Sequence, residues 1–340
     1  MFHARPWGAL SLAPLFPAKS NLPEPIGEAW MTSAECRFAN GLYEGARLGE
    51  SWAAMPPEWM GTQFPHGSSF PLLVKFIFAE EKLSVQVHPD DEYASRNEMA
   101  AGGKGKTEMW HVLRARTGAE VLAGLKPGVT RESFESAIAA GTAEDCLARV
   151  PVSAGDTIFI AAGTPHTIGA GLVLCEIQQY SDLTYRVYDY NRRDAQGRVR
   201  ELHVAKALDV IRFDRQLGGK IPPALLRSGS LAETHFLACR YFAAEKWEFA
   251  SRNPGTTSPE HFDVLIFLEG AGEIAWAGER AAYGPAEVWF LPAGLGEYCL
   301  APDSRTSVIR AYVPGDLDEL SRELAARGLD ENSRARLVFR

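Results

Sequence analysis

The sequence predicts a mainly β protein of two domains with a small helical insert. The chain has 340 residues, which suits two modules, and 46% hydrophobic residues can build a sizeable core. Its 31 glycines and 21 prolines favour many turns over a helical bundle. Short runs rich in β-branched and aromatic residues recur beside turn residues, at 74–78, 83–88, 157–160, 172–178, 262–268 and 288–291.

One region has helical rather than strand periodicity. Thr130 is a suitable N-cap, Gly141 can end the helix, and three apolar residues share one face: Phe134, Ala137 and Ile138. Thr142 then predicts the start of a second helix, with Leu147 and Val150 as its apolar anchors. The pattern indicates a helical hairpin inserted between strands.

Two further helices are predicted at 203–211 and 317–326, the latter ended by Gly328. A segment rich in Gly and Pro is a candidate domain boundary. We therefore expect an N-terminal catalytic domain, its helical insert, a linker and a smaller C-terminal domain, at 1–215, about 127–150, 216–231 and 232–340.

Charge and cysteine content exclude several classes of protein. The formal net charge is −8, from 35 basic and 43 acidic residues, and no basic block suits nucleic acid. The five cysteines are widely spaced without a CxxC pair, which favours a reducing compartment. Pro14 interrupts the apolar residues 7–16, and no apolar run approaches 18 residues, so we expect a cytoplasmic protein without membrane contact.

The segment 82–90 is the most informative. In a strand, alternate side chains share a face, so Ser84, Gln86 and His88 point one way and the intervening valines the other. The valines suit a core, whereas Gln86 and His88 offer an oxygen and a nitrogen to one metal ion. The alternative is a polar, solvent-facing side of an edge strand.

Two later segments add candidate ligands. Lys106 and Glu108 are two residues apart and would share a face, although a solvated ion pair is an alternative. The segment 155–166 reads as a turn, a buried strand, a Gly-containing turn and then His166, and is similar to the second motif of cupins. Ala161 stands where that motif usually has proline.

Together the segments predict a metal centre of Gln86, His88, Glu108 and His166. Two nitrogens and two oxygens suit Zn²⁺, and also Mn²⁺, Co²⁺ or Fe²⁺. Only Glu108 carries charge, so the bound ion keeps net positive charge. That favours Lewis-acid chemistry on an oxyanion over a structural role.

These segments, with the flanking stretches 71–75 and 176–190, resemble type I mannose-6-phosphate isomerases, most closely the short bacterial form. The resemblance extends over roughly residues 1–315. It implies two cupin-like (jelly-roll) β-barrel domains and one zinc ion held by the four residues above. It also implies further site residues: Arg186, Lys106, Asp182 and Glu176 as catalytic residues, and Ser84 and Lys75 near the substrate phosphate.

The activity implied is the interconversion of mannose 6-phosphate and fructose 6-phosphate through a cis-enediol. An enediolate oxygen needs a cation beside it, which the metal and Arg186 can supply. Lys106, Glu176 and Asp182 can all move protons, and the sequence leaves open which one is the general base. An ion pair with Asp182 or Asp189 is the alternative role of Arg186.

The C-terminal domain carries a similar spacing at 286–297, but Glu297 stands where the metal histidine would be. The nearest polar pair is His261 and Asp263, so we expect a metal-free structural domain. Six histidines without a partner pattern are interpreted as surface or satisfied core residues: His3, His66, His111, His203, His235 and His261.

Two other functions are compatible with a cupin-like site. A dioxygenase commonly uses several histidines with a carboxylate, so Gln86 and the nearby Lys106 argue against it. A sugar-phosphate-binding regulator would keep the pocket without needing Lys106, Arg186 and all four ligands. The expected partner is therefore a small sugar phosphate, and the chain is expected to be a monomer or homodimer.

Overall fold

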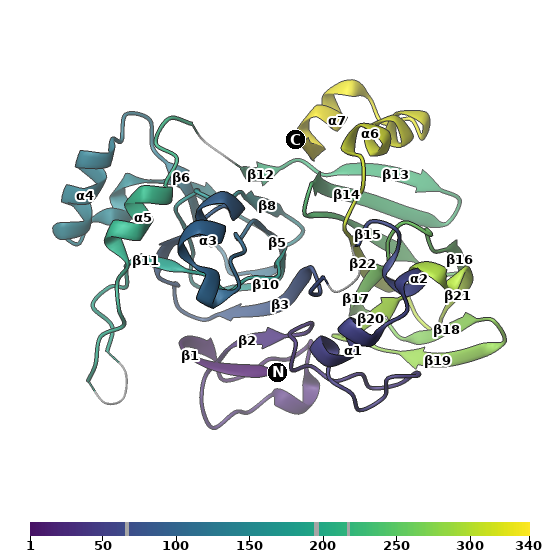
Figure 1. Ribbon diagram of the computed structural model, residues 1–340. Coiled ribbons are helices and arrows are strands. Elements are labelled where there is room, and N and C mark those ends of the chain that lie inside the picture. The colour runs from purple at the N-terminus through teal and green to yellow at the C-terminus, as the bar shows by residue number, and fades with distance from the viewer. Residues whose placement is uncertain (65–67, 194–196, 216–217) are drawn as a thin grey trace. The chain divides into compact units, whose positions relative to one another are not determined.

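The computed structural model describes residues 1–64, 68–193, 197–215 and 218–340, apart from the side chain of Ser228. It is mainly β, as predicted (Figure 1). The chain forms two compact units, each made of discontinuous segments. Unit 1 contains 1–11, 21–30 and 72–221, and unit 2 contains 12–20, 31–71 and 222–340.

Unit 1 contains a seven-stranded and a five-stranded sheet. The first has the order β1 (Phe2–Ala9), β2 (Ile26–Trp30), β3 (Leu72–Ala79), β10 (Leu172–Gln179), β5 (Glu108–Ala115), β8 (Thr157–Ile160) and β12 (Gly219–Ile221). The second has the order β11 (Tyr185–Tyr188), β4 (Val85–Val87), β9 (His166–Ile168), β6 (Glu120–Leu125) and β7 (Leu147–Pro151). All pairings within both sheets are antiparallel.

Two hydrophobic cores hold these sheets. One contains Trp110 and Leu174 of the seven-stranded sheet together with Val121 and Ile168 of the five-stranded sheet. The other combines strands of the five-stranded sheet with α4 (Arg131–Ala139) and α5 (Val204–Val210). Val85 and Val87 are fully buried in this second core. The alternation in β4 therefore sends its valines toward the helices and leaves Gln86 on the opposite face.

The predicted helical hairpin is correct in its first half and wrong in its second. Thr130 caps α4, and its side chain accepts a hydrogen bond from the Ser133 N–H. The second helix does not form. A 3₁₀ turn, η3 (Ala143–Cys146), leads instead into β7, where Leu147 pairs with Leu125 and Val150 pairs with Val121. The three-residue spacing of these two apolar residues imitates a helical face.

Unit 2 also contains two sheets. The larger has the order β13 (Ala224–Ser228), β14 (Leu231–Cys239), β15 (Phe242–Phe249), β22 (Thr306–Tyr312), β17 (Asp263–Glu269) and β20 (Val288–Leu291), with β23 (Val338–Phe339) parallel to β14. The smaller has the order β16 (Asn253–Thr256), β21 (Glu297–Pro302), β18 (Gly272–Trp276) and β19 (Glu279–Tyr283). A core that includes Leu265, Val308, Ile274 and Leu300 joins the two sheets.

The remaining helices are short. They are α1 (Leu48–Ala54), α2 (Pro57–Met60), α3 (Asp91–Asn97), α6 (Leu317–Ala326), α7 (Glu331–Leu337), and the 3₁₀ turns η1 (Pro17–Lys19), η2 (Met99–Ala101) and η4 (Ala293–Leu295). The range predicted for α6 is confirmed, and Gly328 follows it at φ +96°. Across the described part of the chain, no helix is long and apolar enough to span a membrane.

Units 1 and 2 have different residue ranges from the domains expected from the sequence. They divide between Ile221 and Pro222, inside the expected linker 216–231, but half of that linker forms β12 and β13. Residues 216–217 of the linker lie outside the described residues. Segment 31–71 belongs to unit 2, where Trp52 of α1 packs on Phe262 at a ring-centroid distance of 5.2 Å. A range based on chain order alone cannot anticipate this long-range packing.

Candidate active site and metal centre

The four predicted metal ligands converge between the two sheets of unit 1. Gln86 lies in β4 and pairs in register with His166, the first residue of β9. Glu108 begins β5 in the opposite sheet, and His88 follows β4 directly. Antiparallel pairing therefore brings together side chains that are up to 80 residues apart in the chain.

The distances among these side chains suit a single ion. Glu108 Oε2 lies 3.5 Å from His88 Nε2, and Glu108 Oε1 lies 3.3 Å from His166 Nε2. Gln86 Nε2 lies 3.3 Å from His166 Nε2. His88, Glu108 and His166 are all buried, so bulk water cannot satisfy their polar atoms.

Both imidazoles are oriented by main-chain carbonyl groups. The 2.7 Å contact of His88 Nδ1 with Leu183 O and the 2.8 Å contact of His166 Nδ1 with Thr164 O require an N–H at each Nδ1. In the neutral rings both Nε2 atoms are therefore lone-pair acceptors, and they face a carboxylate. Lys106 Nζ lies 2.7 Å from Glu108 Oε2, while Glu108 Oε1 faces the ring nitrogen of His166. This convergence of acceptors fits a cation.

The amide of Gln86 is compatible with the same ligand set. Ser84 Oγ lies 3.5 Å from Gln86 Oε1, while Gln86 Nε2 faces His166. The oxygen and nitrogen of a side-chain amide exchange places when the amide rotates by a half-turn, and their hydrogen-bond partners decide between the two orientations. After that half-turn the oxygen faces the ligand cluster, and the N–H₂ group can donate to Ser84 Oγ.

The protonation states are those that metal ligands need. Burial lowers the pKa of His166 to about 3, and burial and the nearby Lys106 also lower the pKa of His88. Burial alone would raise the pKa of Glu108, but Lys106 and His88 hold it well below its usual value. The site therefore combines neutral imidazoles with an ionised carboxylate.

Lys106 lies directly beside this cluster. Its Nζ is 2.7 Å from Glu108 Oε2 and 3.3 Å from His88 Nε2. Burial lowers the pKa of Lys106, but Glu108, Glu176 and Asp182 outweigh burial and raise it above its ordinary value. Lys106 is therefore an ammonium ion, which can donate a hydrogen bond or a proton but cannot accept one.

Glu176 is the buried carboxyl group best suited to proton transfer. Its Oε2 accepts a hydrogen bond from Trp110 Nε1 at 3.0 Å, and its Oε1 lies 3.6 Å from Lys75 Nζ. Burial and the charge of Glu108 raise the pKa of Glu176 to about 6. A carboxyl group that titrates near neutral pH can both accept and return a proton.

Lys75 and Asp182 form a pair beside Glu176. Lys75 Nζ lies 3.1 Å from Asp182 Oδ1 and 4.5 Å from the centroid of the Trp30 ring. The Lys75 side chain is 4% exposed, whereas that of Asp182 is 57% exposed. The charge of Lys75 is therefore shared among two carboxylates and an aromatic face, which weakens it as an anchor for a phosphate.

Arg186 forms neither of the ion pairs considered from the sequence. Asp182 pairs with Lys75, and Asp189 pairs with Arg192 and Arg200. Arg186 Nε instead donates to Ser84 Oγ at 3.3 Å, and Nη1 donates to the main-chain oxygen of Glu201 at 3.0 Å. Burial and the neighbouring Arg200 lower the pKa of Arg186. Within the described residues this guanidinium has no carboxylate partner.

Unit 1 contains a cavity of about 500 Å³ at these groups. Seven residues predicted or implied for the site line it: Lys75, Ser84, Gln86, Lys106, Glu176, Asp182 and Arg186. His88, Glu108 and His166 are not among its lining residues, and its wall also contains three residues that sequence reasoning missed: Arg5, Arg200 and His203. None of the three belongs to a recognisable motif. His203 was interpreted as a surface or satisfied core residue, and His66 from the same set lies outside the described residues.

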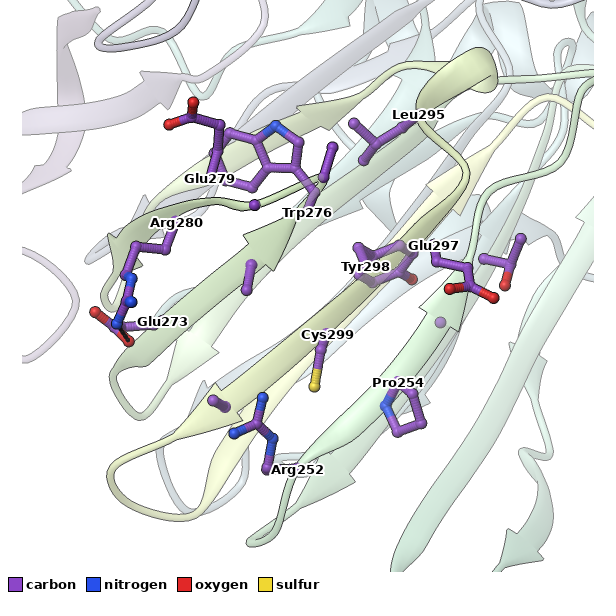
Figure 2. Close-up of a pocket in the computed structure, with 16 residues that line it drawn as sticks. Arg252, Pro254, Glu273, Trp276, Glu279, Arg280, Leu295, Glu297, Tyr298 and Cys299 are labelled. Atoms are coloured by element: carbon purple, nitrogen blue, oxygen red, sulfur yellow. Dashed lines mark ion pairs between the residues drawn. The ribbon is translucent and has the colours of Figure 1, made fainter.

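Unit 2 contains a larger hollow, of about 1150 Å³, on its four-stranded sheet (Figure 2). Glu297 lines it beside Tyr298 and Cys299, and Arg280 pairs with Glu273 at 3.9 Å. No residue predicted for the metal centre or catalysis contributes to this hollow. Its volume alone therefore does not make it the active site.

A second buried cluster in unit 2 contains Glu233, His235 and Glu245. Arginine side chains already neutralise it. Arg327 Nη2 lies 2.6 Å from Glu233 Oε2, and Arg310 Nη1 lies 3.1 Å from Glu245 Oε1. The spacing of Glu233 and His235 repeats that of Gln86 and His88, a signal that the sequence analysis overlooked. With two guanidinium groups in place, the cluster suits an ion-pair network.

Comparison with known proteins places the chain among sugar-phosphate isomerases. The family model for the catalytic domain of type I phosphomannose isomerase matches residues 2–111. The mannose-6-phosphate isomerase ManA of Bacillus subtilis (strain 168) is 34% identical over 309 residues, covering 88% of this chain and 93% of that protein. A mannose-6-phosphate isomerase of Streptococcus mutans is 36% identical over 296 residues, covering 85% and 90%.

A solved structure agrees with this relationship. The crystal structure of the mannose 6-phosphate isomerase from Bacillus subtilis superposes on this chain with a TM-score of 0.82 and 30% identity. The superposition covers 92% of this chain and 97% of the other. The likeness therefore extends through both units and is not limited to the part that the family model matches.

Proposed function

This chain belongs to the mannose-6-phosphate isomerase family, and from that premise we propose that it interconverts mannose 6-phosphate and fructose 6-phosphate through a cis-enediol. One observation carries the proposal. His88, His166 and Glu108 form a buried cluster of convergent acceptor atoms. The cluster contacts Gln86 and Lys106, which line the same cavity as Arg186. The acceptor cluster suits a cation, and Arg186, which has no carboxylate partner among the described residues, suits an anion.

The proposed metal is one Zn²⁺ per chain, held by Gln86, His88, Glu108 and His166, with Mn²⁺, Co²⁺ or Fe²⁺ as alternatives. When bound, it would supply Lewis-acid stabilisation of a substrate oxygen. The donor set of two imidazoles, one carboxylate and one amide supports a borderline ion and contains no thiolate.

The chain's own residues would orient the substrate and move protons. Arg186 can donate to an oxygen that becomes negative in the enediolate, since no carboxylate of the described residues pairs with it. Lys106, held as an ammonium ion, can donate to a substrate oxygen. Glu176, with its pKa raised to about 6, is the proposed base that takes the proton from carbon and returns it. Asp182 would then act through its ion pair with Lys75.

We also propose that the paired sheets of each unit form a cupin-like jelly roll. In unit 1 the order of elements supports this: strand β8, a turn with Gly163 at φ +85°, and then His166 at the start of β9. In unit 2 the corresponding spacing ends in Glu297, and the arginine-neutralised cluster at Glu233 supports a metal-free, structural role.

A coupled assay tests the function. Purified protein should form fructose 6-phosphate from mannose 6-phosphate, lose this turnover with a chelator, and regain it on addition of Zn²⁺. Folded protein without turnover under any of the four metals would contradict the isomerase proposal. Binding of the sugar phosphate without turnover would favour a regulatory protein.

A further inference from the structure

Arg186 is tied to the start of α5 by three hydrogen bonds. The His203 N–H donates to Arg186 O at 2.7 Å, and the Arg186 N–H donates to His203 Nδ1 at 3.3 Å. Arg186 Nη1 donates to Glu201 O at 3.0 Å. Residues 201–203 therefore hold both the main chain and the side chain of Arg186.

The imidazole of His203 has a defined role in this arrangement. Because Nδ1 accepts the Arg186 N–H, the neutral ring carries its hydrogen on Nε2. The other ring nitrogen lies 4.0 Å from Glu201 Oε2 and has no shorter ion-pair contact in the described chain. The ring also lines the cavity that contains Gln86, Lys106 and Glu176.

The groups that restrain Arg186 are all neutral acceptors or donors. An arginine side chain loses rotamer freedom when it is held in one position, and the neighbouring Arg200 and Arg5 repel its charge. A carboxylate partner would hold it in place but would also neutralise it. A hydroxyl oxygen and a main-chain oxygen hold the guanidinium, and an imidazole nitrogen holds the main-chain N–H of Arg186, all without adding negative charge.

We propose that His203 is a positioning residue: its Nδ1 anchors the main-chain N–H of Arg186, so that the guanidinium reaches its neutral acceptors and is presented uncompensated to the reacting substrate. The proposal rests on the proposed isomerase function for the identity of that substrate. His203 does not itself contact the metal ligands in this arrangement. Its contribution passes through Arg186 and should therefore disappear when Arg186 is removed.

Two His203 variants distinguish the hydrogen-bond acceptor of the side chain from its bulk. His203→Leu keeps similar bulk but removes the acceptor, whereas His203→Asn offers Oδ1 close to the position of Nδ1. Lys206→Ala is the matched control, because Lys206 lies in the same helix and pairs with Glu98 without touching Arg186. We expect His203→Leu to lower kcat about 30-fold with KM changed less than about threefold. His203→Asn should recover most of the loss, and Lys206→Ala should match the wild type.

A double-mutant cycle gives the decisive comparison. In an Arg186→Met background, His203→Leu should cost less than about twofold more in kcat, since the two residues act as one unit. Zinc content and melting temperature should be unchanged throughout the series. Additive losses, or a His203→Asn variant as impaired as His203→Leu, would overturn the positioning role.

Crystal structures of the variants distinguish this proposal from the isomerase assignment. The Arg186 guanidinium should leave Ser84 Oγ in His203→Leu and stay in place in His203→Asn. If Arg186 moves as expected but the wild-type protein does not turn over mannose 6-phosphate, positioning holds and the function is wrong. If Arg186 keeps its place in His203→Leu, the positioning role is wrong whatever the activity.

Discussion

His166 Nε2 lies 3.3 Å from Glu108 Oε1, and the histidine Nδ1–H is already committed to a main-chain oxygen. These two buried acceptors face each other without a hydrogen between them, which is unfavourable unless a cation or another donor compensates it. Lys106 Nζ lies 2.7 Å from the other oxygen of Glu108, and the Gln86 amide lies 3.3 Å from His166 Nε2. The proposed metal would therefore add to the stability of the site as well as to its chemistry.

Replacing Glu108 tests that conclusion. We expect Glu108→Gln to bind less than about a tenth of the wild-type zinc and to lose at least about a thousandfold in kcat/KM. The measurements are elemental analysis after dialysis and the coupled assay. Glu132→Gln is the control, since Glu132 is an exposed carboxyl group in the first turn of α4. Stoichiometric zinc in Glu108→Gln would argue against this ligand.

The proposed base gives a defined pH dependence. The pKa of Glu176 is raised to about 6, so its carboxylate predominates above pH 6 and wild-type kcat should fall as the pH drops through 6. Glu176→Gln should lower kcat at least about 100-fold and abolish this acid limb. Asp182→Asn should lose less than about tenfold and keep it. If Asp182→Asn loses more kcat than Glu176→Gln and abolishes the acid limb of the kcat–pH profile, Asp182 is the base.

Lys75 should control the position of the same acid limb. Its ammonium group lies 3.6 Å from Glu176 Oε1 and lowers the pKa of that carboxyl group. Lys75→Met removes this cation from a buried site, so the pKa of Glu176 should rise and the acid limb should move to higher pH. Lys75→Arg keeps the charge and should stay close to the wild type. Identical pH profiles for Lys75→Met and the wild type would show that the two groups are not coupled.

The ion-pair network of unit 2 should be sensitive to acid. Burial raises the pKa of Glu245, but His235 and Arg310 outweigh it and bring the pKa to about 2, from 4.5 in the unfolded chain. Ionised Glu245 therefore favours the folded state above pH 4.5, and this contribution disappears as the pH falls through 2. The shift corresponds to about 3 kcal/mol.

Glu245→Gln isolates this contribution. At pH 7 the variant should be less stable than the wild type, and the difference in the free energy of unfolding should shrink by about 3 kcal/mol between pH 5 and 2. Urea unfolding at a series of pH values measures it. Glu248→Gln, a partly exposed glutamate in the same strand, is the control. A difference that does not vary with pH would contradict the role of the charge.

Local features of the sequence predicted much of the architecture. Alternation in 82–90 placed Val85 and Val87 in a core and Gln86 on the opposite face, as observed. Thr130 caps α4, and α6 spans the predicted residues. Strands at 157–160 and 288–291 also match their predicted bounds. These features depend on period, capping and turn chemistry within one segment, all of which can be read from adjacent residues.

The donor types of the proposed metal centre were predicted from the sequence, because amide, imidazole and carboxylate groups recur at alternate positions of β-rich segments. Which distant segments they pair with or pack against was decided only by the tertiary structure. Leu147 and Val150 became a strand because β6 offered an edge to pair with. Segment 31–71 joined unit 2 because Trp52 packs on Phe262 there. The partner of Arg186 was decided in the same way, since Lys75 and Arg200 occupy the two nearby aspartates and leave its guanidinium to neutral acceptors. Pairing partners distant in the chain leave no periodic signal, so such outcomes depend on the fold.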